Sequence, residues 1–310
     1  AGYAITTGAD NNIIGAFAGN LLTTGVGNTI IGMKAGSNAT SAKENVIIGD
    51  NACGLGVLAN PSGVLGMYNV VIGSTAGYDL TTGCSNILLG KLAGTNLTDN
   101  YSNIAIGSSA LAAAAAGENN NVAIGQNALA TENSNAAYCI AIGREALGLQ
   151  NAAVKNIAIG GLAGDNISGG SENTLLGYMS GSAIGNGGNN TAVGHSAFAA
   201  GVGEHNTIVG ANAGSAALAG NHNTLLGSRA GIMLRGGASN ILVGYNAGAG
   251  MTTGTYNVVI GSSAADVMAG ASSHNIVIGA NALGGEASAA QDCIAIGTNA
   301  LLTQNDVNAK

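Results

Sequence analysis

The stretch Asn28-Thr29-Ile30-Ile31-Gly32 decides the fold, because the chain returns to it along almost its whole length. It recurs as Asn45-Val46-Ile47-Ile48-Gly49 and again as Asn69-Val70-Val71-Ile72-Gly73. Most steps between copies are 17 residues, a few are 16 or 18, and one is 24. The first position of the motif falls at residues 11, 28, 45, 69, 86, 103, 121, 139, 156, 173, 190, 206, 223, 240, 257, 275 and 293.

Each column of the repeat has its own chemistry. A glycine stands four residues after the first position in every copy, and three residues later comes alanine, which only Ser180 replaces. Glycine tolerates positive φ and close backbone approach, so its column predicts a corner that recurs in every coil. The alanine column predicts a site with room for one methyl group. The asparagine column predicts a ladder of side-chain amides that hydrogen-bond along the stack.

The repeat length and its composition together predict the fold. A 17-residue unit is too short for a pair of helices, whereas a short aliphatic run that ends in glycine is typical of a strand and its turn. We therefore predict an all-β parallel β-solenoid of about seventeen coils. Each coil is expected to hold two short strands and two turns, about 4.8 Å from the next coil.

The repeats also set the expected domain organisation. Residues 1–310 are predicted to form a single solenoid domain with a repeat core at about 11–301. The 24-residue step contains the only proline and predicts a loop insertion at about 53–66. A longer repeat of 154 residues, in which Ser85–Gly90 returns as Ser239–Gly244, indicates a block duplication.

The predicted strand is apolar on both faces. The third residue after the asparagine is always Ile, Leu or Val, as in Ile31, Leu89 and Val209, and the second is apolar throughout. Adjacent strand residues point to opposite sides, so one face fills the interior and the other forms a stripe larger than an ordinary exposed patch. The same stripe on sister chains would cover it, so the sequence predicts self-association.

Two units carry a resemblance to known families: Asn121-Val122-Ala123-Ile124-Gly125-Gln126-Asn127-Ala128-Leu129 and Asn190-Thr191-Ala192-Val193-Gly194-His195-Ser196-Ala197-Phe198. They resemble the head repeats of YadA-like trimeric autotransporter adhesins and the Asn-Thr-Ala-Ile-Gly repeats of bacteriophage tail fibres. The resemblance extends over residues 11 to about 301. It implies a left-handed parallel β-roll in a homotrimer, located on a virion tail appendage or at the extracellular cell surface.

The 17-residue spacing lies closer to the fibre type than to the shorter coils of the adhesin heads. The expected function is therefore a structural and adhesive segment of a phage tail fibre or a similar appendage, serving as a rigid shaft or receptor-binding surface for host attachment. The alternative is the head of a bacterial trimeric adhesin that binds matrix or surface glycans. The sequence does not single out receptor-binding residues.

The composition argues against several other classes. Net charge is −7 with no basic run, which argues against a nucleic-acid partner, and no apolar stretch is long enough for membrane insertion. The acidic residues form no recurrent pair of the kind that a glycosidase needs, although coil stacking can bring Asp165 or Glu172 near another acid. We predict no enzyme activity, no catalytic residues and no cofactor.

The histidines and cysteines are candidate special sites. His205 and His222 precede the asparagine in successive coils, beside Glu204, which makes a metal site conceivable. The same column also holds unrelated residues, so it is interpreted as exposed surface and no metal is predicted. Cys139 and Cys293 replace asparagine nine coils apart, too far for a disulfide. Most of the four cysteines are expected to be buried small hydrophobes.

Tyrosines and threonines supply the remaining candidates. Exposed tyrosines on a polar surface can stack against sugar rings. They precede the asparagine or follow the glycine at Tyr68, Tyr138, Tyr178, Tyr245 and Tyr256. An ice-binding solenoid is a less favoured third hypothesis, because other coils place Val or Ile in the column that would form the ice face. Its threonines are Thr29, Thr174, Thr191, Thr207 and Thr224.

Overall fold

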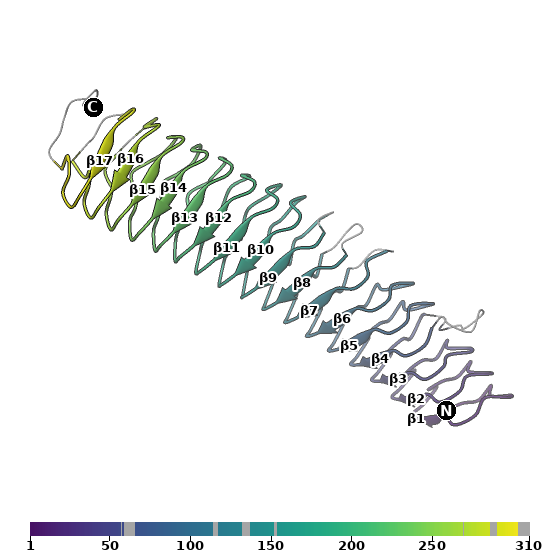
Figure 1. Ribbon diagram of the computed structural model, residues 1–310. Helices are drawn as coiled ribbons and strands as arrows, with labels where there is room; N and C mark the ends of the chain where they lie inside the picture. Colours follow the sequence, from purple (N-terminus) through teal and green to yellow (C-terminus); the bar gives the residue numbers. More distant parts are fainter. Residues whose placement is uncertain are drawn as a thin grey trace. The chain divides into compact units, whose positions relative to one another are not determined.

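The computed structural model describes residues 1–56, 58, 66–113, 117–131, 137–151, 154–268, 270–285 and 290–302. The chain divides into two units, Ala1–Asn156 and Ile157–Lys310. Among the described residues, unit 1 holds strands β1–β8 and unit 2 holds β9–β17 (Figure 1). Each unit is a parallel β-solenoid with a repeat of about 17 residues, and no helix occurs in the described ranges. The predicted all-β parallel solenoid is confirmed.

Every strand is three residues long and begins one residue after the asparagine column. The strands of unit 1 are β1 Asn12–Ile14, β2 Thr29–Ile31, β3 Val46–Ile48, β4 Val70–Ile72, β5 Ile87–Leu89, β6 Ile104–Ile106, β7 Val122–Ile124 and β8 Ile140–Ile142. Those of unit 2 are β9 Ile157–Ile159, β10 Thr174–Leu176, β11 Thr191–Val193, β12 Thr207–Val209, β13 Thr224–Leu226, β14 Ile241–Val243, β15 Val258–Ile260, β16 Ile276–Ile278 and β17 Ile294–Ile296.

Strand register is independent of coil length. Within each unit, equivalent positions of successive strands pair in parallel, as Thr29 does with Val46. The 24-residue step keeps Val46 opposite Val70, and the 16-residue step keeps Thr191 opposite Thr207. Of the loop expected at about 53–66, residues 57 and 59–65 lie outside the described residues. Extra chain length is therefore absorbed away from the strands.

The corner glycines confirm the geometry predicted from their column. Gly32 has φ +134° and Gly227 has φ +137°, values that side-chain-bearing residues rarely adopt. A methyl group on Gly32 would lie 2.5 Å from the carbonyl oxygen of Gly49 in the next coil. No rotamer change relieves a clash with backbone, so these corners require glycine. The alanine beside each corner fits the predicted methyl-sized site; Ala35 and Ala230, for example, are fully buried.

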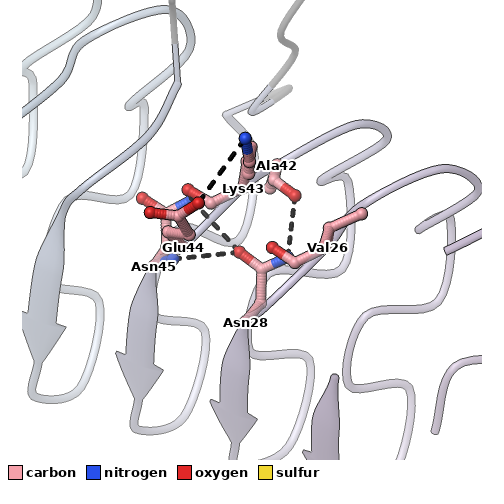
Figure 2. Close-up of polar contacts among 6 residues, drawn as sticks. All are labelled: Val26, Asn28, Ala42, Lys43, Glu44 and Asn45. Atoms are coloured by element: carbon pink, nitrogen blue, oxygen red, sulfur yellow. Dashed lines mark hydrogen bonds and ion pairs between the residues drawn. The ribbon is translucent and has the colours of Figure 1, made fainter. Parts of the chain in front are cut away.

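The asparagine ladder is also confirmed. Asn28 Oδ1 accepts from the backbone N–H of Asn45 at 3.1 Å and from its Nδ2 at 3.2 Å, while Asn28 Nδ2 donates to the carbonyl of Ala42 at 2.7 Å (Figure 2). Each amide therefore links neighbouring coils and also holds the segment that leads into the next strand. Because these amides are fully buried, an unmatched one would be costly.

The second strand expected in each coil is not present as a regular strand in the described part of the chain. Its place is taken by isolated bridges such as Ala183 with Ala200 and Gly201 with Leu218. Single hydrogen bonds still join the coils there, for example from Thr23 N–H to the Thr40 carbonyl at 2.8 Å. This side carries the differences in coil length, so its segments do not repeat closely enough to form a longer ladder.

Three columns of each coil adopt the left-handed backbone conformation without being restricted to glycine. They lie just before the asparagine, as in His222 (φ 59°), and two and four residues after the corner glycine, as in Arg229 (φ 60°) and Leu129 (φ 51°). Among the described residues other than glycine with positive φ, Thr75 is the only β-branched one. Branching at Cβ is disfavoured in this conformation, which explains why the otherwise varied residues of these columns almost all lack it.

Interior volume is divided between two positions of each coil, the middle residue of the strand and the residue four after the corner glycine. In β10 the strand supplies Leu175, and a methyl group on Gly181 would lie 2.6 Å from Leu175 Cδ2. In β7 the strand supplies only Ala123, and Leu129 fills the space instead; both are fully buried. The pairs Ala105 with Leu111, Ala141 with Leu147 and Ala192 with Phe198 follow the second arrangement.

Candidate functional site

The outer strand face consists of the first and third residues of every strand, which point away from the interior. The middle residue is buried in β2–β17, whereas Leu89, Leu176 and Leu226 in the third position are 41, 44 and 47% exposed. The predicted second apolar face is therefore confirmed in each unit. Neither row contains a charged residue in any strand.

In unit 1, strands β3–β8 carry aliphatic residues in both rows of the outer strand face. The pairs are Val46 and Ile48, Val70 and Ile72, Ile87 and Leu89, Ile104 and Ile106, Val122 and Ile124, and Ile140 and Ile142. Consecutive strands therefore offer almost the same surface at each step. An uncharged aliphatic face of this kind favours contact with another apolar surface.

Unit 2 differs, because the first row of β10–β13 is an uninterrupted line of Thr174, Thr191, Thr207 and Thr224, here called the threonine row. These residues lie opposite one another in successive strands. Three are exposed and Thr191 is half-buried. Their hydroxyl groups form no hydrogen bond with other residues in the described ranges. Thr29 of the predicted column lies apart, in unit 1.

All four histidines lie in two columns that flank the outer strand face, and each stacks on an aromatic ring of the neighbouring coil. His205 stacks on His222 with ring centroids 5.2 Å apart. His195 stacks on Tyr178 at 5.6 Å, and His274 stacks on Tyr256 at 5.3 Å. The spacing of the coils produces these pairs directly, because equivalent side chains leave the backbone about 5 Å apart in the same direction.

The stacks bear on the metal and sugar hypotheses. Within the described ranges, no group of three or more His, Cys, Asp or Glu side chains is placed to hold a metal ion. Tyr178 and Tyr256 stack one ring face on a histidine, yet they remain 49 and 62% exposed. Tyr68, Tyr138 and Tyr245 are 53, 62 and 51% exposed and take part in no ring stack with another described residue.

The two acids considered for catalysis lie in one coil of unit 2. Asp165 is half-buried, five residues after the corner glycine of β9, and Glu172 is exposed in the left-handed position before Asn173. Glu118, which the sequence did not single out, is fully buried, and its backbone carbonyl accepts from Asn100 and Asn103. The sequence pattern could not predict the burial of Glu118, because this residue lies in the part of the coil that varies between repeats.

Three of the four cysteines are buried and Cys84 is half-buried, so the interpretation as small hydrophobes is confirmed for most of them. Burial raises the pKa of the Cys53 thiol to about 12. Cys139 occupies the asparagine column, and its backbone N–H still donates to Asn121 Oδ1 at 2.9 Å. The buried Gln150 bridges onward, donating to Cys139 Sγ at 3.3 Å and accepting from Asn156 Nδ2 at 3.0 Å. A side chain from the opposite side thus substitutes for the missing amide.

Comparison with protein families, curated proteins and solved structures finds no match to this chain. In the part of the chain that the structure describes, no helix has the length and apolar character needed to span a bilayer.

Proposed function

We propose that this chain is a structural and adhesive segment of a phage tail fibre or a similar extracellular appendage, assembled as a homotrimer of left-handed β-rolls and used in host attachment. The uncharged aliphatic outer strand face carries the proposal. If this apolar face stayed exposed to water, it would promote aggregation. A fibre made of several copies covers it and keeps the flanking columns free for contact with a receptor.

The outer strand face is large enough to hold copies together. At about 25 cal/mol per Å², the transfer energy of an aliphatic side chain corresponds to roughly 100 Å². With Leu176 and Ile260 44 and 38% exposed, each contributes roughly 40 Å². Over the fourteen aliphatic outer positions of unit 2 this amounts to roughly 560 Å², and the fourteen of unit 1 add as much, so together they exceed the ~800 Å² that each partner buries in a standard interface.

The interior supports a mechanical role. Within each unit, successive coils are tied together by strand pairing, by the asparagine ladder, which Gln150 completes at Cys139, and by single bonds on the opposite side. Buried amide bonds and a close-packed aliphatic interior resist bending, because distortion would expose or unpair them. The turns tolerate different residues, so the surface can vary while the core remains constant.

The test is the mass of the purified chain by light scattering, which we expect to equal three chains. A double variant, Leu89→Lys with Leu226→Lys, places charge on the outer strand face of both units and should dissociate the assembly into single chains. The matched control is Ser85→Lys with Ser239→Lys, in the flanking column where Lys155 occurs naturally. The control should keep the wild-type mass and circular dichroism spectrum.

A wild-type chain that stays monomeric at high concentration would overturn the trimer and require another cover for the apolar face. Equal masses for the outer-face variant and its control would show that the chains associate elsewhere.

A further inference from the structure

A repetitive interface poses a problem of register. In β3–β8 the outer strand face repeats nearly the same aliphatic pair at every strand, about 4.8 Å apart. Two such faces can slide past each other by one strand and recover almost all of their contacts. Apolar contact therefore supplies affinity without fixing the axial position, as in coiled coils, where a polar residue in the seam specifies the register.

The threonine row interrupts this repetition once in unit 2. It spans four consecutive strands and is followed at β14 by Ile241 and preceded at β9 by Ile157. The residues in the third position of the same strands stay aliphatic, from Leu176 to Leu226. The row is thus a short polar segment with defined ends, set within an apolar face.

We propose that the threonine row fixes the axial register between copies of this chain, an inference that rests on the homotrimer proposed above. Cyclic symmetry places the same strand of every copy at the same level, so threonine meets threonine when the copies are aligned. A hydroxyl both donates and accepts, so the groups satisfy one another around the axis. A shift of one strand brings the terminal hydroxyls of the row against Ile157 or Ile241.

Threonine suits this role better than a charged residue. Its methyl group and branched Cβ preserve the aliphatic contact and the strand conformation. A buried hydroxyl without a partner is nevertheless disfavoured, by roughly tenfold in population or more. Each additional strand of displacement leaves another level of hydroxyls unmatched, so the penalty grows with the size of the shift.

The test compares two fourfold variants of the row. In the first, Thr174, Thr191, Thr207 and Thr224 are all replaced by valine, which keeps the shape and removes the hydroxyl. In the matched control the same four positions become serine, which keeps the hydroxyl and removes the methyl. Light scattering and circular dichroism report whether each protein still folds and associates.

Register is measured by pulsed electron paramagnetic resonance between nitroxide labels on different copies. Ser228→Cys places the label at an exposed position, and Cys84→Ser removes the half-buried thiol. The wild type and the serine control should each give one narrow interchain distance. The valine variant should keep the same mass while additional distances rise from below one tenth of the population to a share comparable with the first.

A second variant tests the same inference without removing the threonine row. Thr174→Val with Ile241→Thr moves the row by one strand without shortening it, and we expect a single interchain distance. The inference is overturned if the valine variant keeps one distance at unchanged mass, if it dissociates, or if the moved row gives several distances. A monomeric wild type would instead overturn the proposed homotrimer, and the mass measurement identifies that case separately.

Discussion

Strands β6–β8 of unit 1 and β12–β14 of unit 2 fill the solenoid interior beside the corner with side chains from different positions. In unit 1 the strands contribute Ala105, Ala123 and Ala141, and the interior is filled by leucines in the left-handed position after the corner glycine. In unit 2 the strands contribute Ile208, Leu225 and Leu242, and that position is glycine. Every one of the named strand residues is fully buried.

The difference shows that two columns share one volume. Leucine in the left-handed position carries a backbone cost that glycine avoids, and an alanine in the strand gives up packing area. Each arrangement accepts one of these costs and avoids the other. In these strands the choice between glycine and leucine follows the strand residue six positions earlier, so the two columns have to be considered together.

The largest expected effect tests what both regions share. Gly125→Ala at the corner after β7 and Gly227→Ala at the corner after β13 each place a methyl group 2.4 Å from a carbonyl oxygen of the next coil, at φ +134° and +137°. Each should lower the free energy of unfolding by about 3 kcal/mol or more. Gly236→Ala is the control in thermal unfolding, since its methyl group would meet only Thr253 Cγ2 at 3.5 Å. Melting temperatures equal to that of the control would refute the corner assignment.

A swap between the two arrangements tests the shared volume. Gly181→Leu, in the coil of β10, which has the same arrangement as β12–β14, should cost roughly 3 kcal/mol from overpacking and backbone strain. Adding Leu175→Ala should recover at least about 1 kcal/mol, because it recreates the pairing of Ala123 with Leu129. Chemical denaturation of the four proteins in this cycle gives the coupling energy.

The reverse swap, Ala123→Leu with Leu129→Gly, should likewise be more stable than Ala123→Leu alone. Additive effects in both cycles would mean that the two columns fill separate spaces.

The asparagine ladder distinguishes the regions in a different way. Asn223 exchanges hydrogen bonds with Asn206 and Asn240, so Asn223→Ala leaves buried donors and acceptors unmatched. We expect a loss of about 2 kcal/mol. Cys139→Ala, at a point where the ladder already relies on Gln150, should cost less than half as much. A larger loss for Cys139→Ala in urea unfolding would show that the thiol, not the amide, is the important group.

The smallest effect concerns Cys53, which occupies the same left-handed position as Leu129 and Gly231. Burial raises the pKa of its thiol from 9.0 to about 12. Because the folded value is the higher one, the stability contributed by the neutral thiol is complete below pH 9 and is lost as pH rises toward 12. By pH 10 the total loss should be roughly 1.4 kcal/mol, and Cys53→Ala should lack that part of the slope. Parallel slopes for the two proteins would contradict the burial of this thiol.

The columns with fixed chemistry could be predicted from sequence alone. Gly32, Ala35 and Asn45 belong to columns whose occupants hardly vary, and each geometry follows from the residue type. The left-handed columns were missed because Asp10 and His205 share no side-chain chemistry. Their common property, the near absence of β-branching, becomes visible only when all coils are aligned.

The remaining features arise from packing across coils. The exclusion between Leu175 and Gly181 could have been found by comparing columns in pairs, since bulky strand residues tend to accompany glycine. The contribution of Gln150 to the ladder could not, because it comes from the segment of variable length. The prediction of a second regular strand in each coil is wrong for the same reason, because that segment differs too much between coils to form a continuous ladder.

The independence of register from coil length has a consequence for how such a chain can change over time. When a deletion or duplication covers a whole number of units, the residues on either side of the junction keep their places in the repeat. The interior of the shortened or lengthened protein is then packed by the same rules as before. The 154-residue spacing between Cys139 and Cys293 corresponds to nine such units. Length thus behaves as an adjustable parameter that recombination can reset in one event, while the rules for placing each residue stay the same.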